Sequence, residues 1–317
     1  MIQIVIEDVL RNVAQLTSAI QSKKVLGITS DSRQVQSGFI FVAIKGVSVD
    51  GNQFINDAFD KGALCVITDD NDIGATDTII KVSNARKALT QLASNFYGNP
   101  EKRIKTIGIT GTNGKTSTTL ILKDILEADG KKVIQIGTLG IIPKIQSLDF
   151  SLTTPDPVSL FQVLHYAVEE KFDYAILEVS SHALSQNRVD SIVFDSVGFT
   201  NLTLDHLDYH KSLDNYFNDK KKLFGLIKEG NNPLILSDTD YGQAICKDYP
   251  NSKKVSLKNS DADYFCNDVS INQDGITGII HSKDSSVQIN STLIGRYNLE
   301  NILLASSIAL ELSLIHI

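Results

Sequence analysis

The stretch TIGITGTNGKTSTTLIL, residues 106–122, decides the fold of most of this chain. An apolar run leads into a glycine-rich turn, and a lysine, several hydroxyl side chains and a helical pattern follow it. A strand, a glycine turn and a helix in this order point backbone amides and the positive end of the helix dipole at a phosphate. The sequence therefore predicts a phosphate-binding loop.

Two residues of this loop have distinct expected roles. Lys115 is expected to reach the β- and γ-phosphates of a nucleotide, and Thr116 to bind magnesium. The spacing is GxxGKT, because Ile109 stands where the commoner GxxxxGK[ST] loop has its first glycine. The alternative is a glycine turn that only joins a strand to a helix. The expected nucleotide-binding residues of the loop are Gly111, Thr112, Asn113, Gly114, Lys115, Thr116 and Ser117.

Strand and helix patterns alternate around the loop. Continuous apolar runs occupy residues 105–110, 132–138, 174–180 and 196–203. Such runs between helical segments are typical of parallel strands that are buried on both faces of a sheet. From about residue 260 to residue 294, short strands separated by polar turns predict an antiparallel extension. The fold class is α/β: we expect a P-loop-type ATPase domain over residues 101–317, with a mostly parallel sheet.

The first hundred residues predict a smaller α/β domain. Helical patterns cover residues 6–16, 52–63 and 85–97, and strand patterns cover residues 38–46 and 64–70. The last helix is expected to end at Gly98, with Pro100 just beyond it, because glycine favours the backbone that closes a helix and proline cannot continue one. We therefore expect an N-terminal domain over residues 1–100.

Composition limits the partners of this protein. The chain has 317 residues, 42% of them hydrophobic, and a formal net charge of −7 with a pI near 5.4. A negative protein repels phosphate backbones and anionic lipids, so we expect neither nucleic acid nor a membrane as a partner. Three cysteines without metal spacing, no signal peptide and no long apolar run predict a cytoplasmic protein, and we expect a monomer.

Polar side chains follow two further strands of the predicted sheet. Glu178 ends one apolar run, at the carboxyl edge where open α/β sheets place their ligands. The segment NLTLDHLDYH follows another run and brings Asp205, His206, Asp208 and His210 to the same edge. Carboxylates and imidazoles there are candidate magnesium ligands or proton-transfer groups. A solvated rim position for Glu178, or a capping role for a histidine, remains the alternative.

One lysine of the run DKKKLFG differs from its neighbours. In the predicted helix from Ser212, the apolar stripe begins at Leu213, and Lys220 lies on it at position i+7. Lys221 and Lys222 lie off the stripe. A lysine that faces inward loses hydration, so its pKa falls and its amine becomes reactive. The alternative is a buried stem whose ammonium reaches water.

The motifs TGTNGKTSTT, TTPDP, LEVSSHALSQNRVD, NLTLDHLDYHKSLDNYF and GRYNLENILLA together resemble the Mur ligase family. They come in family order across nearly the whole chain, and TSDSRQVQSGFIFVAIKGVSVDG is similar to a UDP-binding N-terminal domain of that family. The closest pattern is the branch that joins a diamino acid, meso-diaminopimelate or L-lysine, to UDP-N-acetylmuramoyl-L-alanyl-D-glutamate in peptidoglycan synthesis. The resemblance implies an amide-forming ligase: ATP phosphorylates the D-glutamate carboxylate, and the incoming amine attacks the acyl phosphate.

The resemblance also implies roles for individual residues. Implied catalytic residues are Lys115, Glu178, His206 and Lys220. Implied ligands of Mg²⁺ are Thr116, Glu178, His206 and Lys220, the last as a carbamate made with carbon dioxide. The adenine-side residues of ATP would be Asn298 and Asn301, unless these only cap a helix. The UDP-substrate would be held by Ser30, Ser32, Val47, Ser48, Val49, Thr153, Thr154, Ser180, Gln186 and Arg188.

Alternatives within and outside the family remain. A folylpolyglutamate synthase has a similar loop but begins near it, whereas about a hundred residues precede the loop here. MurF also has a UDP-binding domain, but the EVSSHALSQNRVD and DHLDYH motifs fit it less well. A non-catalytic binding module or a non-ligating fragment is the main alternative, and a GTP switch would need a guanine-reading motif.

The C-terminal end bears on activity. The family's C-terminal amino-acid-binding domain has no counterpart here, and the last apolar helix runs to the final residue without a polar stop. We therefore expect a truncated chain whose last residues are not native, and which binds the UDP-substrate without ligating. Which amino acid is added cannot be read from this sequence.

Overall fold

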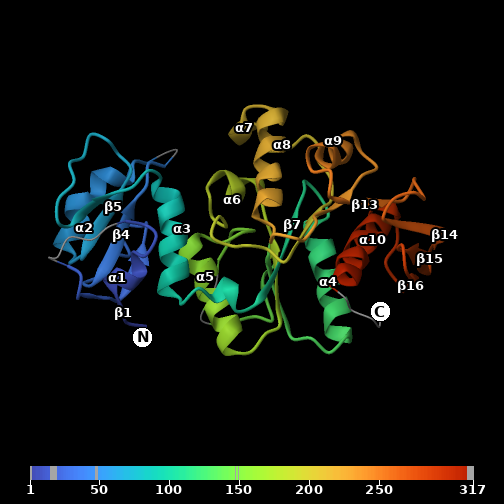
Figure 1. The fold of residues 1–317 in the computed structure, drawn as a ribbon, viewed down its shortest axis with the longest axis horizontal. Coiled ribbons are helices and arrows are strands. Elements are labelled where there is room, and N and C mark those ends of the chain that lie inside the picture. Colours follow the sequence, from blue (N-terminus) through green and yellow to red (C-terminus); the bar gives the residue numbers. More distant parts are fainter. Residues whose placement is uncertain (1, 15–19, 47–48, 147, 149, 313–317) are drawn as a thin grey trace. The chain divides into compact units, whose positions relative to one another are not determined.

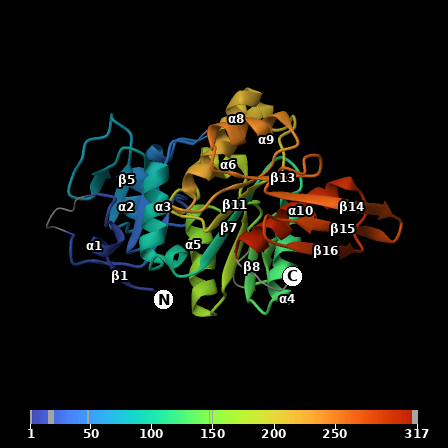
Figure 2. The ribbon, with the colours of Figure 1, turned by 45° about the vertical axis from the view of Figure 1, so that its right-hand side comes forward.

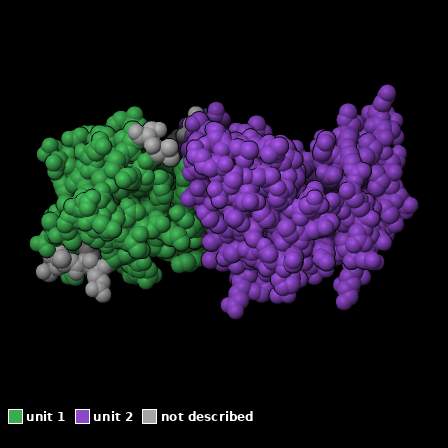
Figure 3. Space-filling view, turned by 90° about the horizontal axis from the view of Figure 1, so that it is seen from above, with its two compact units in different colours: residues 1–103, 155–168, 186–191 green, residues 104–154, 169–185, 192–317 purple. Residues whose placement is uncertain are grey.

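The structure, a computed structural model, describes residues 2–14, 20–46, 49–146, 148 and 150–312. These residues form two compact units, which Figure 3 colours separately. The first unit comprises residues 1–103, 155–168 and 186–191, and the second comprises residues 104–154, 169–185 and 192–317. The first unit thus includes two segments that come from the middle of the chain.

The first unit is built around a four-stranded parallel sheet in the order β3-β4-β5-β6. Its strands are β3 Gly27–Thr29, β4 Phe39–Ala43, β5 Cys65–Thr68 and β6 Ile79–Lys81, with β1 Ile4–Val5 pairing β2 Lys24–Val25 apart from them. Its helices are α1 Ile6–Val9, α2 Ile55–Asp60, α3 Ala85–Phe96 and α5 Pro157–Glu169. The small α/β unit expected from the sequence is therefore confirmed.

One predicted helix of this unit is wrong. The helical pattern at residues 6–16 forms only the four-residue helix α1, which ends at Val9. Asn12 adopts a left-handed backbone with φ of 63°, which a continuing right-handed helix excludes. Residues 15 and 16 of the predicted helix lie outside the described residues. The apolar stripe therefore marked a buried face rather than a long helix.

Helix α3 begins and ends as its sequence predicts. The Asn84 side chain accepts a hydrogen bond from the Lys87 backbone amide and so caps the first turn. Past the other end, Gly98 takes a positive φ of 77°, a conformation that costs glycine little. A 3₁₀ turn, Pro100–Lys102, follows and leads to the second unit.

Glu101, in that turn, carries a buried carboxyl group. It is 6% exposed; its Oε1 accepts from Ser94 Oγ at 2.9 Å, whereas its buried Oε2 has no partner among the described residues. Burial raises the pKa of Glu101 above its ordinary value of 4.5. The folded chain therefore holds this proton to higher pH than the unfolded chain, and stability falls as pH rises through the raised pKa.

We therefore expect Glu101→Gln to be more stable than the wild type at pH 7. Its advantage should disappear as pH falls towards 4.5, where the wild-type carboxyl is protonated in both states. Denaturant unfolding of both proteins between pH 4 and pH 8 checks this, with Glu7→Gln as the control at an exposed site. An equal or lower stability of Glu101→Gln at pH 7 would contradict the prediction.

The second unit is built on a ten-stranded sheet, in the order β16-β15-β14-β13-β12-β11-β7-β10-β8-β9. The strands from β8 to β14 in this order pair in parallel, and β14, β15 and β16 pair antiparallel, as expected from the sequence. Figure 2 shows this extension in orange to red. The strands are β7 Lys105–Thr110, β8 Val133–Gly137, β9 Gly140–Ile142, β10 Tyr174–Glu178, β11 Ser196–Phe199, β12 Leu234–Leu236, β13 Lys253–Ser256, β14 Tyr264–Asn272, β15 Gly275–His281 and β16 Ser286–Ser291.

Helices connect these strands and bury their apolar faces. They are α4 Lys115–Ala128, α6 Ser181–Ser185, α7 Leu207–His210, α8 Leu213–Lys221, α9 Asp240–Asp248 and α10 Arg296–Glu311. Helices α4 and α10 lie side by side (Figure 1), and their apolar side chains share one core with β7, β10 and β12. In the described ranges, no helix has the length and apolar character needed to cross a membrane.

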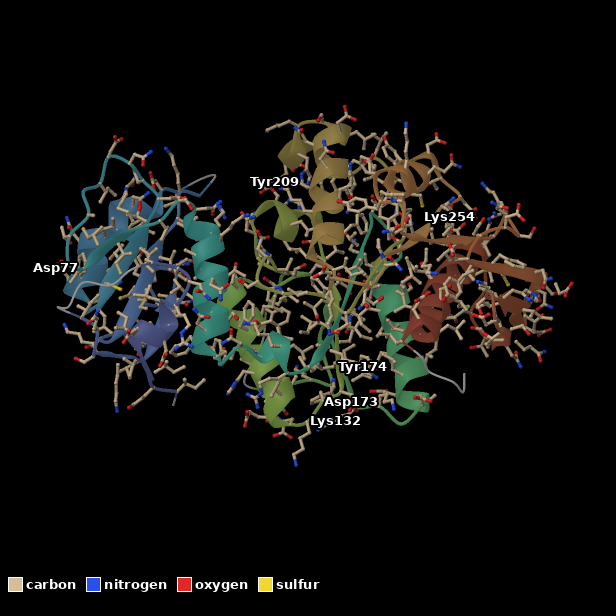
Figure 4. All side chains as sticks on the ribbon, in the orientation of Figure 1. Asp77, Lys132, Asp173, Tyr174, Tyr209 and Lys254 are labelled. Atoms are coloured by element: carbon tan, nitrogen blue, oxygen red, sulfur yellow. The ribbon has the colours of Figure 1, made fainter. Side chains whose placement is uncertain are left out.

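The two edges of the parallel strands differ. Lys132, Asp173 and Tyr174 gather at the amino edge, where the Lys132 backbone amide donates to Asp173 Oδ2 at 2.7 Å. Figure 4 shows these residues at one end of the sheet and Tyr209 at the other. The loops after β7, β8, β10 and β11 all leave from the opposite, carboxyl edge, so the side chains that follow these strands meet there.

Candidate active site

The glycine-rich loop after β7 has a backbone that only glycine suits at two positions. Gly111 has φ of 151° and Gly114 has φ of 83°. A Cβ atom on Gly111 would lie 1.8 Å from Thr200 Oγ1, and one on Gly114 would lie 2.4 Å from Asn301 Oδ1. Helix α4 begins directly at Lys115, so Thr116 and Ser117 lie in its first turn. The loop therefore has the strand, turn and helix order of a phosphate cradle.

The segment after β11 braces this loop. Thr200 Oγ1 donates to the Asn113 carbonyl at 2.6 Å. The Thr112 amide donates to the Asn201 carbonyl at 2.9 Å, and the Asn113 amide donates to Asn201 Oδ1 at 3.0 Å. Our sequence analysis missed Thr200 and Asn201. Their signal was a hydroxyl and an amide directly after an apolar run that ends at the same edge as the loop.

Two lysine ammonium groups meet at one carbonyl of the loop. Lys115 Nζ donates to the carbonyls of Gly111 and Thr112, at 2.9 Å each, and Lys220 Nζ donates to the Gly111 carbonyl at 2.8 Å. Lys220, on α8, is 1% exposed, and its Nζ lies 4.4 Å from the centre of the Tyr216 ring. The stripe on the helix thus brings this lysine inside.

The surroundings of both lysines favour the loss of a proton. Burial lowers the pKa of Lys115, which the carboxylates of Glu178 and Asp205 partly offset. The pKa of Lys220 falls well below its ordinary value because of burial and, next, the charge of Lys115, and Asp205 partly offsets this fall. Two like charges at one carbonyl oxygen repel, so Lys220 is the amine that most readily becomes neutral.

Glu178, at the end of β10, is held by a set of donors. It is 1% exposed. Its Oε2 accepts from Thr116 Oγ1 at 2.8 Å and from Thr138 Oγ1 at 3.0 Å, and its Oε1 accepts from the Thr138 amide at 3.0 Å. Gln135 Nε2 lies 3.4 Å from the same Oε1 and 3.3 Å from Thr119 Oγ1. The carboxylate is therefore fixed beside the first turn of α4.

Gln135 and Thr138 are further residues that sequence reasoning missed. Gln135 is fully buried in β8, and its Oε1 has no partner among the described residues. A lone amide within the apolar run KVIQIGT was the available signal, because a buried polar side chain in a strand costs free energy unless it has a role.

We predict that Gly137→Ala displaces Glu178. A Cβ atom at Gly137 would lie 2.1 Å from Glu178 Oε1, and the hydrogen bonds above prevent the carboxylate from moving without loss. The expected result is an affinity for Mg²⁺–ATP that is lower by about tenfold or more, because a misplaced charged ligand loses more than 1 kcal/mol. Calorimetric titration checks this. Gly225→Ala is the control, since nothing lies within 4 Å of its Cβ position; equal affinity of both variants would contradict the prediction.

His206 stands apart from Glu178 in this structure. It begins α7 with a left-handed backbone, and its side chain is 48% exposed and 3.5 Å from Asp205 Oδ2. Its ring packs near those of His182 and Tyr216. Across the described ranges, no three His, Cys, Asp or Glu side chains are grouped as metal ligands. The imidazole is therefore at the predicted edge, but it is open to solvent.

The two asparagines of α10 lie differently. Asn301 is buried beside the glycine-rich loop, and its Oδ1 accepts from Thr118 Oγ1 at 3.2 Å. Asn298 is half-buried, and its Nδ2 donates to the Ile294 carbonyl at 2.8 Å. The contact of Asn298 closes the start of its own helix, whereas Asn301 joins α10 to the loop.

Three residues expected to bind the UDP-substrate lie beside Glu178. Thr154 Oγ1 donates to the Glu178 carbonyl at 2.8 Å and to Ser180 Oγ at 3.2 Å, and the Ser180 amide donates back to Thr154 Oγ1. Thr153 Oγ1 lies 3.1 Å from Thr138 Oγ1. The second unit therefore brings Thr153, Thr154 and Ser180 to the edge of the sheet that holds the loop.

The remaining predicted substrate residues belong to the first unit. Ser30 follows β3 and is exposed, and the Ser32 carbonyl accepts from Lys61 Nζ at 2.7 Å. Val49 is 57% exposed, whereas Val47 and Ser48 lie outside the described residues. Gln186 and Arg188 contact each other, with Arg188 Nη2 donating to Gln186 Oε1 at 2.8 Å.

Comparisons with known proteins agree with these features. Residues 109–309 match the Mur ligase middle domain, and residues 24–97 match the model described as Mur ligase family, catalytic domain. A relative from Syntrophomonas wolfei, the UDP-N-acetylmuramoyl-L-alanyl-D-glutamate–2,6-diaminopimelate ligase, is 39% identical over 300 residues, which are 91% of this chain and 60% of that protein. This chain thus spans less than two thirds of the relative's length.

Solved structures share the fold. A UDP-N-acetylmuramoyl-L-alanyl-D-glutamate–2,6-diaminopimelate ligase aligns with a TM-score of 0.84 and 24% identity, over 98% of this chain and 64% of that one. The MurF ligase of Thermotoga maritima in complex with ADP aligns with a TM-score of 0.58 and 20% identity, over 90% of this chain and 63% of that one. With its two matched domain models, the loop and the sheet described above, this chain belongs to the Mur ligase family.

Proposed function

We propose that this chain carries the UDP-substrate and ATP sites of a ligase that makes a peptidoglycan precursor. The ligase would add a diamino acid, meso-diaminopimelate or L-lysine, to the D-glutamate of UDP-N-acetylmuramoyl-L-alanyl-D-glutamate. The relative from Syntrophomonas wolfei, 39% identical, is named for this reaction with 2,6-diaminopimelate. The observation that carries the proposal is the convergence of Lys115 and Lys220 on the Gly111 carbonyl, next to the pair Thr116 and Glu178.

The glycine-rich loop would hold the phosphates of ATP. Lys115 already lies against the loop, and its ammonium would exchange two backbone carbonyls for phosphate oxygens when the nucleotide binds. Asn301, in contact with Thr118 behind the loop, would take the adenine side together with Asn298. The bound ADP of the Thermotoga maritima MurF, which shares this fold, supports a nucleotide here.

The residues around Glu178 fit magnesium. A hydroxyl and a carboxylate, 2.8 Å apart, offer the oxygen ligands that Mg²⁺ prefers, and Thr138 and Gln135 hold the carboxylate from behind. His206 would complete the set by resemblance to the family. Bound magnesium would neutralise the charge that develops on the transferred phosphoryl group.

Lys220 fits a carbamate. A neutral amine can attack the carbon of carbon dioxide, so that an N–C bond forms, one proton leaves and an anion replaces a buried cation. The lowered pKa of Lys220 favours the neutral amine, and the adjacent ammonium of Lys115 would attract the product anion. The carbamate would then be a second anionic magnesium ligand beside the loop.

In the proposed reaction the chain mainly positions its substrates. The D-glutamate carboxylate attacks the γ-phosphorus of ATP and ADP leaves; the amine of the diamino acid then displaces phosphate from the acyl phosphate. Thr153, Thr154 and Ser180 would orient the dipeptide at the loop, and Arg188 would hold a carboxylate or phosphate. The uridine and its phosphates would lie on Ser30, Ser32 and residues 47–49. We also propose a monomer of the cytoplasm.

Calorimetric titration with UDP-N-acetylmuramoyl-L-alanyl-D-glutamate tests the proposal. The same compound without D-glutamate, and a folate, serve as controls. We expect selective binding of the full dipeptide compound, because the residues assigned to the dipeptide and to the uridine are all in this chain. No binding by a chain shown by circular dichroism to be folded, or preference for the folate, would contradict the assignment.

A further inference from the structure

His210, the last residue of α7, makes two side-chain hydrogen bonds inside the second unit. Its Nδ1 lies 2.8 Å from Asp219 Oδ2, and its Nε2 lies 2.9 Å from Ser181 Oγ. The residue is 4% exposed, and Ser181 is 2% exposed. An ionised carboxylate only accepts hydrogen bonds, so Nδ1 carries the proton towards Asp219, and Nε2 of the neutral ring accepts from the Ser181 hydroxyl.

Each partner of this imidazole is adjacent to a residue of the proposed site. Ser181 follows Ser180, which is bonded to Thr154, and Asp219 precedes Lys220 on α8. The His210 backbone amide also donates to the His206 carbonyl at 3.0 Å. One side chain thus joins the starts or ends of three segments that carry proposed substrate, magnesium and carbamate residues.

The contacts have the order serine, histidine, carboxylate that hydrolases use. Here the serine is almost fully buried at the start of α6, and its hydroxyl hydrogen is directed to the imidazole. A reactant could not approach it without unfolding the turn. The arrangement is therefore suited to holding segments in register rather than to nucleophilic attack.

We propose that His210 is a positioning residue of this site, which sets Ser180 through Ser181 and Lys220 through Asp219. The inference rests on the proposed function, since it concerns the ligands of that site. The two hydrogen bonds divide the role: the Nε2 contact supports binding of the UDP-substrate, and the Nδ1 contact supports the segment that carries Lys220 and thereby binding of the magnesium nucleotide.

Two substitutions separate these contacts. An asparagine amide occupies the place of Nδ1, so His210→Asn keeps a donor for Asp219 and loses Ser181. A glutamine amide reaches the place of Nε2, so His210→Gln keeps a partner for Ser181 and loses Asp219. The dissociation constants of UDP-N-acetylmuramoyl-L-alanyl-D-glutamate and of Mg²⁺–ADP are measured for the 317-residue chain by calorimetry. His281→Asn, at an imidazole that contacts Asn267 in the antiparallel extension, is the matched control.

We expect His210→Asn to weaken the UDP compound by about tenfold and Mg²⁺–ADP by less than about twofold. His210→Gln should show the reverse selectivity, and His281→Asn should change neither. Melting curves accompany each titration. If His210→Asn or His210→Gln does not fold, Ser181→Ala and Asp219→Asn remove the same contacts from the other side, with the same two expected results.

Other outcomes contradict the role. Equal weakening of both ligands by both variants, or no change beyond that of the control, would show that His210 only stabilises the fold. A wild-type chain that binds neither ligand would instead overturn the proposed function and, with it, the positioning role. The two failures are thereby distinguished by the wild-type titration.

Discussion

Replacing Gly111 by alanine is expected to lower the affinity for Mg²⁺–ATP by about 100-fold, the loss that a misplacement of about 1 Å in a binding group causes. The new Cβ atom would lie 1.8 Å from Thr200 Oγ1 and 3.0 Å from the backbone nitrogen and oxygen of Asn201. Thr200 and Asn201 cannot retreat without releasing their hydrogen bonds to Asn113 and Thr112. The whole loop must therefore shift.

A control separates the clash from backbone strain. Gly130 also has a positive φ, of 76°, but nothing lies within 4 Å of its Cβ position. Gly130→Ala carries the strain alone, so it should lower the melting temperature slightly and leave nucleotide affinity unchanged. Calorimetric titration of both variants is the measurement. Wild-type affinity in Gly111→Ala would show that the loop does not hold the nucleotide as proposed.

Lys220→Met is expected to raise stability while it removes the carbamate. Methionine matches the unbranched stem of lysine, so packing is kept, and the variant no longer buries an ammonium group. The Gly111 carbonyl keeps its hydrogen bond from Lys115. In buffer free of carbon dioxide at pH 7 we expect a gain in the free energy of unfolding of about 1 kcal/mol or more.

The pH dependence of this gain has a defined sign. The pKa of Lys220 is lowered in the folded chain, so the folded chain releases this proton first and wild-type stability rises with pH between the lowered pKa and the ordinary value of 10.5. The advantage of Lys220→Met should shrink across the same range. Lys221→Met, whose ammonium pairs with Asp248 at the surface, is the control. A less stable Lys220→Met would contradict the expected cost of the buried cation.

The carbamate itself has a direct readout. With ¹³C-labelled bicarbonate, the wild-type chain should show a carbamate carbon resonance that Lys220→Met lacks. The same spectrum of Lys221→Met should resemble that of the wild type. A resonance that persists in Lys220→Met would assign the carbamate to another amine.

Local patterns were sufficient wherever the physical cause was local. The apolar runs and glycines around residue 111 gave the strand, the loop and helix α4, and the alternating strands near the end gave the antiparallel extension. The position of Lys220 on the stripe of its helix placed it inside. The pattern at residues 6–16 failed because a positive φ at Asn12 interrupts the helix, and asparagine tolerates that conformation without a strong signal in the sequence.

The sequence by itself therefore determined the family, the order of strands and helices, and which side chains stand at the carboxyl edge of the sheet. Only the tertiary structure decided their partners: Thr116 meets Glu178 across 62 positions of the chain, and His210 meets Ser181 across 29. Periodicity fixes which face of an element is buried, because it depends on neighbours three or four residues away. Contacts such as those of Gln135 and Thr138 depend on which strands become neighbours, and that is settled only when the whole sheet is formed.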